Sequence, residues 1–280
     1  MYDKIETLKN SIIHHGPSNN RVYLTKLSPQ DYPEITNSLD NLAIKNKYTK
    51  IFAKIPAGLK QAFLENDYIQ EACIPKFYKG SEDAIFLGKY FSSDRKIEAN
   101  QESIDKILAL AKTKKDEWLI KKKPLNDDSC KIIVASTNYA SEMSSVYKIV
   151  FESYPFPIHE PEYLLETMKT HIKYFCFIEN NKIISIASSE MDKDNKNVEM
   201  TDFATLPEYR GRSLASYLLY QMEKEMKELS FHTAYTIARA ISPGMNITFA
   251  KLGYNYAGTL TNNTNICGNL ESMNIWYKHL

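Results

Sequence analysis

Apolar and polar positions alternate with two different periods in this chain, and both periods occur in its first and second parts. Segments 21–27, 48–55, 68–75, 131–136, 173–178, 183–191, 198–205, 233–240, 254–260 and 273–278 are predicted to be strands, either from a period of two, as in 21–27, or from a run of apolar and β-branched residues, as in 198–205. Helical spacing occurs at 28–46, 58–65, 139–151, 162–170, 213–229 and 244–252, and from residue 98 into a lysine-rich stretch. Residues 1–20 contain a polar turn and are assigned no element, residues 84–91 form a short apolar element, and 261–269 are predicted to form a polar loop. The pattern predicts the α/β (α+β) class.

The lysine-rich stretch, residues 121–129, is the best candidate for a linker. Lys121, Lys122 and Lys123 repel one another, Pro124 breaks a helix, and residues 126–129 favour a turn. We therefore predict an N-terminal α/β domain over 1–125 and a second domain over 126–280. The second domain has a net charge of −4 against +5 for the first, which favours a cationic substrate.

Composition excludes several classes of function. The chain has 280 residues, of which 43% are apolar and 25% charged, as in a globular protein. A net charge of +1 argues against a nucleic-acid partner, and no apolar run approaches the ~20 residues of a membrane span. The four cysteines lack paired spacing, so we expect reduced thiols and a cytoplasmic protein. The adjacent His14 and His15 point to different faces of any regular element, so no metal site is expected.

Residues 197–215 carry the clearest chemical signal. Pro207 cannot donate a ladder hydrogen bond, so it ends the strand before it. A helix begins near Ser213, and the first turn of a helix has unpaired amides and a positive dipole end that bind anions. Arg210 and Arg212 add positive charge to this turn. The stretch therefore predicts a site for the phosphates of a nucleotide-like cofactor.

The predicted element order over 131–280 resembles that of the GNAT superfamily of acyl-CoA-dependent N-acetyltransferases. Its signature is Arg or Gln, two residues, Gly, one residue, then Gly or Ala, and the stretch Arg210-Gly211-Arg212-Ser213-Leu214-Ala215 departs from it only at Ser213. We expect that serine to offer its amide and to cap the helix. The segment 249–254 is similar to a second motif of the superfamily. The resemblance implies a mixed sheet flanked by helices, acetyl-CoA bound by the amides of Arg210–Ala215, and no metal. It also implies a bulge at Phe203, Ala204 and Thr205 that frees an amide for the thioester carbonyl.

A closer resemblance spans most of the chain. The runs RVYLTKL, KIFAKIP, SYPFPI, MTDFATLPEYRG and ESMNIWYK together resemble the β-lysine N-acetyltransferases. Those enzymes acetylate the side-chain amine of β-lysine with acetyl-CoA, and the product, Nε-acetyl-β-lysine, is a compatible solute under osmotic stress. The resemblance implies the same reaction here, with a small cationic amine as the partner.

Two carboxylates are candidates for the base that removes a proton from the amine. Glu199 lies eleven residues before Arg210, the position of the general base in related histone-type acetyltransferases. Asp202 is the alternative base or an amine anchor, although a regular strand would turn it to the opposite face. Phe249 stands where many superfamily members have a tyrosine acid, so that role stays open between Tyr254 and water.

Further residues are candidates for binding a diamino acid. Arg239 can pair with a carboxylate in bidentate fashion. Glu160, Asn263 and Glu271 can hold ammonium groups, and Tyr154 and Phe156 can form an aromatic wall or plain core.

Three alternatives stay open. The enzyme can acetylate a polyamine or another diamino acid, or the chain can be a catalytically idle acetyl-CoA-binding sensor. The oligomeric state is undetermined, with a homodimer as one option.

Residues 52–75 also parallel 237–260, since each is a strand, a Pro/Gly turn, a helix ending in Phe-x4-Tyr, and a strand. We hypothesise that the first domain is a degenerate repeat of the second without its phosphate loop.

Overall fold

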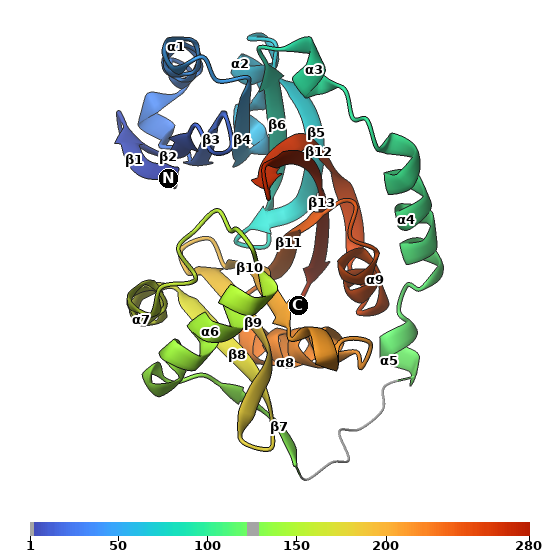
Figure 1. Cartoon of the computed structure of the whole chain (residues 1–280). Helices are drawn as coiled ribbons and strands as arrows, with labels where there is room; N and C mark the ends of the chain where they lie inside the picture. Colours follow the sequence, from blue (N-terminus) through green and yellow to red (C-terminus); the bar gives the residue numbers. More distant parts are fainter. Residues whose placement is uncertain (1–2, 122–128) are drawn as a thin grey trace.

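A single mixed sheet runs through the whole structure. The computed structural model describes residues 3–121 and 129–280. Within these ranges the sheet has 13 strands in the order β1-β2-β3-β4-β6-β5-β12-β13-β11-β10-β9-β8-β7 (Figure 1). Helices flank it, so the expected mixed α/β architecture is confirmed. The predicted domain boundary at residues 125 and 126 lies outside the described residues.

The first part of the chain forms one end of this sheet. Its elements are β1 (Lys4–Leu8), β2 (Ser11–Gly16), β3 (Arg21–Lys26), α1 (Ile35–Asn46), β4 (Lys50–Pro56), α2 (Lys60–Leu64), β5 (Ile69–Tyr78), β6 (Glu82–Tyr90), α3 (Ser93–Lys96), α4 (Gln101–Thr113) and α5 (Glu117–Lys121). The pattern assigned no element to residues 1–20, but β1 and β2 form a hairpin there. The edge strand β1 is mostly exposed and tolerates polar residues, while β2 buries His14 and His15 where apolar residues would have signalled a strand.

The second part forms the other end of the sheet. Its elements are β7 (Cys130–Val134), α6 (Ala140–Val150), α7 (Pro161–Thr170), β8 (Ile172–Glu179), β9 (Lys182–Asp192), β10 (Asn197–Thr205), α8 (Leu214–Glu228), β11 (Thr233–Arg239), α9 (Pro243–Lys251), β12 (Asn255–Ile266) and β13 (Asn269–His279). The prediction of a loop over 261–269 was wrong, because β12 and β13 continue to a tight turn at Cys267 and Gly268. Polar residues suit these strands because Asn262 and Asn265 bond to the backbone of the first part.

The two ends of the sheet share one topology. The order β1-β2-β3-β4-β6-β5 corresponds to β8-β9-β10-β11-β13-β12, and the parallel pair, β3 with β4 or β10 with β11, stands at the same place. Phe63 and Tyr68 pack edge to face at 5.1 Å, as Phe249 and Tyr254 do at 5.0 Å. The hypothesis of a degenerate repeat requires these correspondences. Between β3 and α1, residues 27–34 contain neither glycine nor arginine, so the first copy lacks the phosphate loop.

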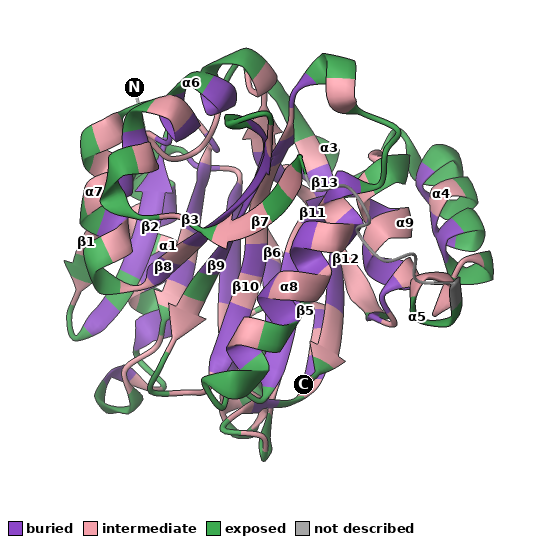
Figure 2. Cartoon of the chain, turned by 90° about the horizontal axis from the view of Figure 1, so that it is seen from below, coloured by how far each residue is buried: buried purple, intermediate pink, exposed green. Residues whose placement is uncertain are grey.

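Helices cover both faces of the sheet in the second part of the chain, and the first part of the chain covers a region of one face. One core lies between the sheet and α4, α8 and α9, which turn their exposed sides to solvent (Figure 2). On the other face, α6 and α7 pack over β8 and β9. On that same face Phe52 and Phe86 of the first part pack against Tyr235 and Ile275. The strand β10 therefore lies between these two coverings.

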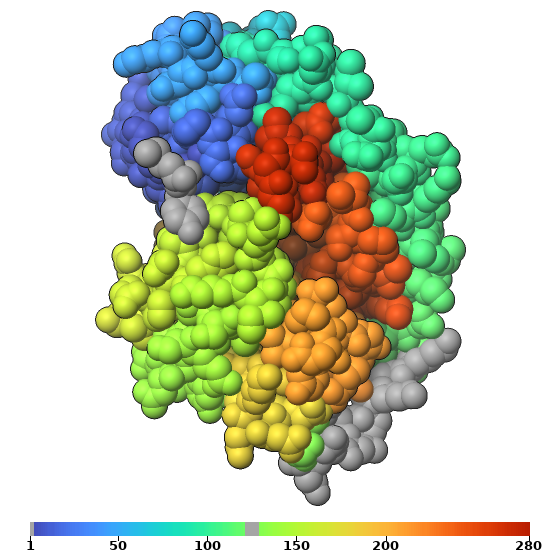
Figure 3. All heavy atoms as spheres, viewed as in Figure 1, coloured from blue at the N-terminus to red at the C-terminus, as the bar shows by residue number. Residues whose placement is uncertain are grey.

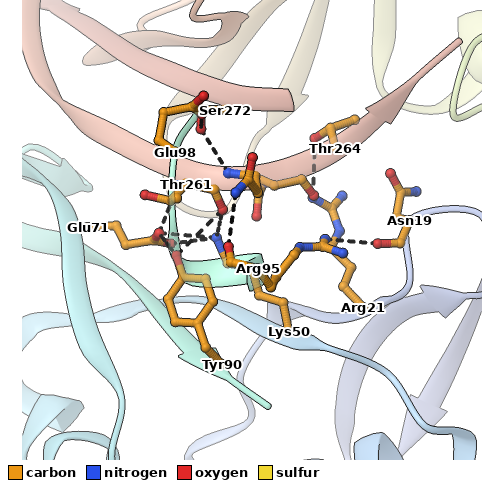
Figure 4. Close-up of polar contacts among 12 residues, drawn as sticks. Asn19, Arg21, Lys50, Glu71, Tyr90, Arg95, Glu98, Thr261, Thr264 and Ser272 are labelled. Carbon is orange, nitrogen blue, oxygen red and sulfur yellow. Dashed lines mark hydrogen bonds and ion pairs between the residues drawn. The ribbon is translucent and has the colours of Figure 1, made fainter. Parts of the chain in front are cut away.

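A buried polar cluster joins the first part of the chain to β12 (Figure 4). Lys50, which is fully buried, donates to the carbonyl of Thr261 at 2.8 Å and pairs with Glu71 at 2.9 Å. The Thr261 amide donates to the same Glu71 carboxylate at 2.8 Å. Arg21 donates to the carbonyl of Asn263 and to the hydroxyl of Thr264. Because an unpaired buried charge is costly, these contacts hold the two ends of the sheet in one arrangement.

The turn between β12 and β13 also reaches the loop after α6. The Cys267 amide donates to Ser153 Oγ at 3.1 Å. In Figure 3 the red spheres of the C-terminal strands lie beside both the blue N-terminal part and the yellow-green segment that carries α6. The loop after α6 is therefore anchored to the turn between β12 and β13.

Candidate active site

The sheet opens between β10 and β11. These strands pair only over Asn197–Glu199 with Thr233–Tyr235, although β10 continues to Thr205 and β11 to Arg239. Each strand keeps its other neighbour along this length, β9 for β10 and β13 for β11. The backbone edges that face each other beyond Glu199 are thus free of ladder hydrogen bonds to one another. Backbone groups at such edges are left to hydrogen-bond an extended group placed between the two strands.

A β-bulge in β10 changes the direction of Asp202. The register with β9 shifts between Thr201 and Ala204, and Asp202 has a φ of 54°. The bulge was expected at Phe203–Thr205, so it begins nearer the amino end than expected, and Ala204 and Thr205 pair regularly with β9. In a regular strand Asp202 would point away from Glu199. The bulge instead brings it to Ser188 of β9, whose hydroxyl donates to its carboxylate at 2.5 Å.

Glu199 occupies the last paired position before the opening. It lies directly across from Glu190 on β9, and its side chain is partly buried. Burial, together with the charges of Glu190 and Asp202, raises the pKa of Glu199 to about 8. Lys54 and a hydrogen bond from Tyr235 act in the opposite direction. Its carboxyl group can therefore take up a proton reversibly near neutral pH, as a general base must.

Asp202 is held more firmly than Glu199. The hydroxyl of Tyr154 donates to one of its oxygens, and Ser188 donates to the other. Burial raises the pKa of Asp202, and these hydrogen bonds oppose that rise. A carboxylate with donors on both oxygens is suited to fixing the geometry of the site.

The predicted anion site has open amides at the start of α8. Gly211 and Ser213 both have positive φ, 81° and 60°, and nothing lies within 4 Å of where a Gly211 side chain would begin. Among the hydrogen bonds of the described residues, none uses the amides of residues 211–214. Two left-handed residues followed by a helix turn successive amides toward one point, which suits a phosphate.

Two side chains of this turn differ from expectation. Ser213 does not cap α8, because its left-handed backbone turns the hydroxyl away from the helix amides. Arg212 is paired with Glu179 at 2.5 Å, whereas the exposed Arg210 makes a single side-chain hydrogen bond within the part of the chain that the structure describes, to the Thr205 carbonyl at 3.3 Å. Arg210 is thus the more available cation for a phosphate. Leu214 and Ala215 begin the helix, and Leu214 packs in the core beneath it.

Phe203, Ala204 and Thr205, the residues expected near the thioester, lie at the carboxyl end of the bulged strand β10. Phe203 packs edge to face on Phe249 at 5.6 Å. Ala204 is buried, and the Thr205 hydroxyl bonds to Ser185 at 2.7 Å. The candidate acid Tyr254 is fully buried, and burial beside Glu223 raises its pKa well above the usual value. This makes Tyr254 a poor proton donor.

The structure separates the residues predicted to bind substrate. Tyr154 contacts Asp202, as a site residue should, and Phe156 stacks on His14 of the first part at 5.2 Å. Glu160 is an exposed residue at the start of α7. The remaining three residues, Arg239, Asn263 and Glu271, are bonded to other residues of the chain.

Arg239 and Glu271, proposed separately as anchors, bond to each other at 2.7 and 2.6 Å. Each therefore satisfies the charge that the substrate was expected to supply. Asn263 is buried, and its carbonyl accepts a hydrogen bond from Arg21 of the polar cluster. Adjacent strands placed these residues near the opening, but the sequence could not reveal the competing partners.

Sequence reasoning missed several residues of the site. Glu190 and Ser188 come from β9, and the register of the predicted hairpin with β10 could have identified them. Tyr235 comes from β11 and bonds to Glu199. Lys54 comes from β4 of the first part and donates to the Tyr235 hydroxyl at 3.2 Å. No local signal marks Lys54, since only the folding of one end of the sheet onto the other brings it there.

Comparison with known proteins identifies the family. The profile of the acetyltransferase (GNAT) family matches residues 143–254. The chain is 43% identical to the β-lysine N(6)-acetyltransferase of Methanococcus maripaludis, over 99% of this chain and 98% of that protein. It is 36% identical to the β-lysine N(6)-acetyltransferase of Methanosarcina mazei, over 89% and 98% of the two chains. It is also 34% identical to the N-acetyltransferase YodP of Bacillus subtilis, over 80% and 78%. The chain therefore belongs to the GNAT family of acetyltransferases, in the group that includes the β-lysine N(6)-acetyltransferases.

Proposed function

We propose that this enzyme transfers the acetyl group of acetyl-CoA to the side-chain amine of β-lysine, giving Nε-acetyl-β-lysine. The names of its relatives support this substrate. The observation that carries the mechanism is Glu199, which stands at the opening between β10 and β11 with a pKa raised to about 8.

The phosphates of acetyl-CoA would bind at the amides of residues 211–214 and at Arg210. The fit rests on the left-handed backbone at Gly211 and Ser213, and on the open space above Gly211. The acetyl thioester would enter the opening between the strands, where free amides of the bulge can polarise its carbonyl. None of the four cysteines is required as a carrier. Cys176, which lies on the neighbouring β8, is buried with a raised pKa and stays protonated.

The amine must lose a proton before it can attack. An alkyl ammonium with a pKa of ~10.4 is neutral in only about one molecule in a few thousand at pH 7. Glu199 accepts a proton from the ammonium, and the nitrogen attacks the thioester carbonyl. The C–N bond forms while the C–S bond breaks, and the second proton of the nitrogen goes to the departing sulfur. Asp202, oriented by Tyr154 and Ser188, holds the amine in place or serves as the alternative base.

The wider role follows from the product. A neutralised, highly soluble amino acid is suited to act as a compatible solute under osmotic stress, and we place the enzyme in the cytoplasm, where acetyl-CoA is made. None of the helices in residues 3–121 and 129–280 combines the length and apolar character that crossing a bilayer requires.

A release assay tests the proposed function. CoA release is measured with β-lysine, α-lysine and spermidine, for the wild type and for Glu199→Gln. We expect turnover with β-lysine above the other two amines, and its loss in the variant. Equal turnover with α-lysine and β-lysine would refute the proposed specificity for β-lysine. Faster turnover with spermidine would show that the enzyme is a polyamine acetyltransferase. Binding of acetyl-CoA without turnover of any amine would instead indicate a sensor.

A further inference from the structure

Lys54 is a cation at the site that forms no ion pair with another residue of 3–121 or 129–280. Its side chain is only partly buried, and its Nζ donates to the Tyr235 hydroxyl at 3.2 Å. It lies over the rings of Tyr235 and Phe77, at 5.4 and 5.6 Å. Among the ion pairs of the described residues, none involves Lys54. An ammonium group has three donors, so Lys54 retains donors for a further group.

Other cations near this face are already engaged. Arg239 is bonded twice to Glu271. Arg21, Lys50 and Arg95 are buried, and each donates to backbone carbonyls in the polar cluster that joins the two ends of the sheet. Of these cations, Lys54 is the one that faces Glu199 with donors to spare.

The charges around Lys54 form a pattern that matches a diamino acid. Glu199 and Asp202 supply two carboxylates on β10, and Lys54 supplies one ammonium. The third carboxylate nearby, Glu190 of β9, is exposed and lies 4.0 Å from His171. A diamino acid carries two ammonium groups and one carboxylate. Its charges are therefore the complement of those of the site, whereas a diamine leaves Lys54 without a partner.

We propose that Lys54, supplied by the first part of the chain, binds the carboxylate of the substrate and so makes the enzyme select a diamino acid over a diamine. This inference rests on the proposed function. Tyr235 sets the distance between the two subsites, because it accepts from Lys54 and donates to Glu199. The amine to be acetylated lies at the Glu199 end, and the carboxylate lies at the Lys54 end. The first part of the chain thus acts as a specificity element, in place of the phosphate loop that it lacks.

Substrate comparison in matched variants tests this role. kcat/KM is measured for β-lysine and for 1,4-diaminobutane, a diamine whose amines are separated by four carbons, as in β-lysine, and which has no carboxylate. Lys54→Met should lower kcat/KM for β-lysine by about 10- to 100-fold, the range for losing a hydrogen bond to a charged group, mainly through KM. The diamine should be unaffected or improved, and Lys54→Arg should restore part of the loss. The control is Lys89→Met, a lysine of the neighbouring β6 that pairs instead with Asp40 at 2.6 Å.

The charge can also be removed from the substrate. β-Lysinamide, which lacks the carboxylate, should show a raised KM with the wild type, and this test does not depend on the stability of any variant. An equal loss of β-lysine and diamine turnover in Lys54→Met, or an unchanged KM for the amide in the wild type, would overturn the proposal. Absence of β-lysine turnover in the wild type would refute the proposed function instead, so the two failures are distinguishable.

Discussion

Replacing Glu199 with glutamine removes the proposed base while keeping the size of the side chain. A positioned general base contributes about 10²- to 10⁴-fold to the rate, so kcat should fall by that factor. The pH dependence gives a sharper test. With a pKa of about 8, Glu199 is ionised in roughly one molecule in ten at pH 7, so kcat/KM should rise about tenfold from pH 7 to a plateau near pH 9.

The assay is CoA release from β-lysine between pH 6 and pH 9.5, because kcat/KM reports the pKa of the free enzyme. The rise with pH should be present in the wild type and absent in Glu199→Gln. Glu228→Gln, an exposed carboxylate of α8, controls for the exchange itself. A variant that loses less than about tenfold in kcat, or that retains the rise near pH 8, would assign the base to Asp202 or to another group.

Three further predictions follow from the site. Ser213→Gly should raise the melting temperature by a few degrees, because a non-glycine residue in the left-handed region costs about 1 kcal/mol. The KM for acetyl-CoA should not rise. An unchanged or lowered melting temperature would argue against strain at Ser213. Tyr154→Phe removes a donor to Asp202 and should lower kcat about tenfold with little change in the KM for acetyl-CoA; full activity would show that this hydrogen bond is dispensable. Because burial raises the pKa of Glu199, its contribution to stability is present below its unfolded pKa and is lost as pH rises through about 8. Glu199→Gln should therefore melt higher than the wild type at pH 9, with a smaller difference at pH 5; the reverse order would contradict a raised pKa.

Local patterning predicted most strands and helices of this fold. The segments at β3, β4, β8, β9, β10 and β11 carry apolar and β-branched residues at their buried positions, because one or both faces of each are packed. The strand segments that the pattern did not predict share one cause. In β2 and at the far end of β12 the buried positions hold histidine, asparagine and threonine, whose partners lie far away in sequence. Polar residues in those positions resemble a loop until the partners are known.

Some features of the candidate site could likewise be predicted from nearby residues, whereas others depend on distant ones. Residues 199–215 lie on one strand, one turn and one helix, so their spacing alone placed Glu199 before the phosphate loop. The bulge at Asp202, the Arg239–Glu271 pair and the buried position of Asn263 depend on contacts between distant strands. The sequence therefore could not show that Arg239, Glu271 and Asn263 have hydrogen-bond partners within the chain.

The sequence by itself determined the family, because its motifs recur along most of the chain. It also predicted the anion-binding turn and the acidic strand, because each of these consists of residues close together in the chain. The tertiary structure alone decided what surrounds Glu199. Folding one end of the sheet onto the other brings Lys54 to within hydrogen-bonding distance of Tyr235, although 181 residues separate them in sequence. Burial and neighbouring charge then set the pKa of Glu199, because the energy of a charge depends on its surroundings in space and not on its neighbours in the chain.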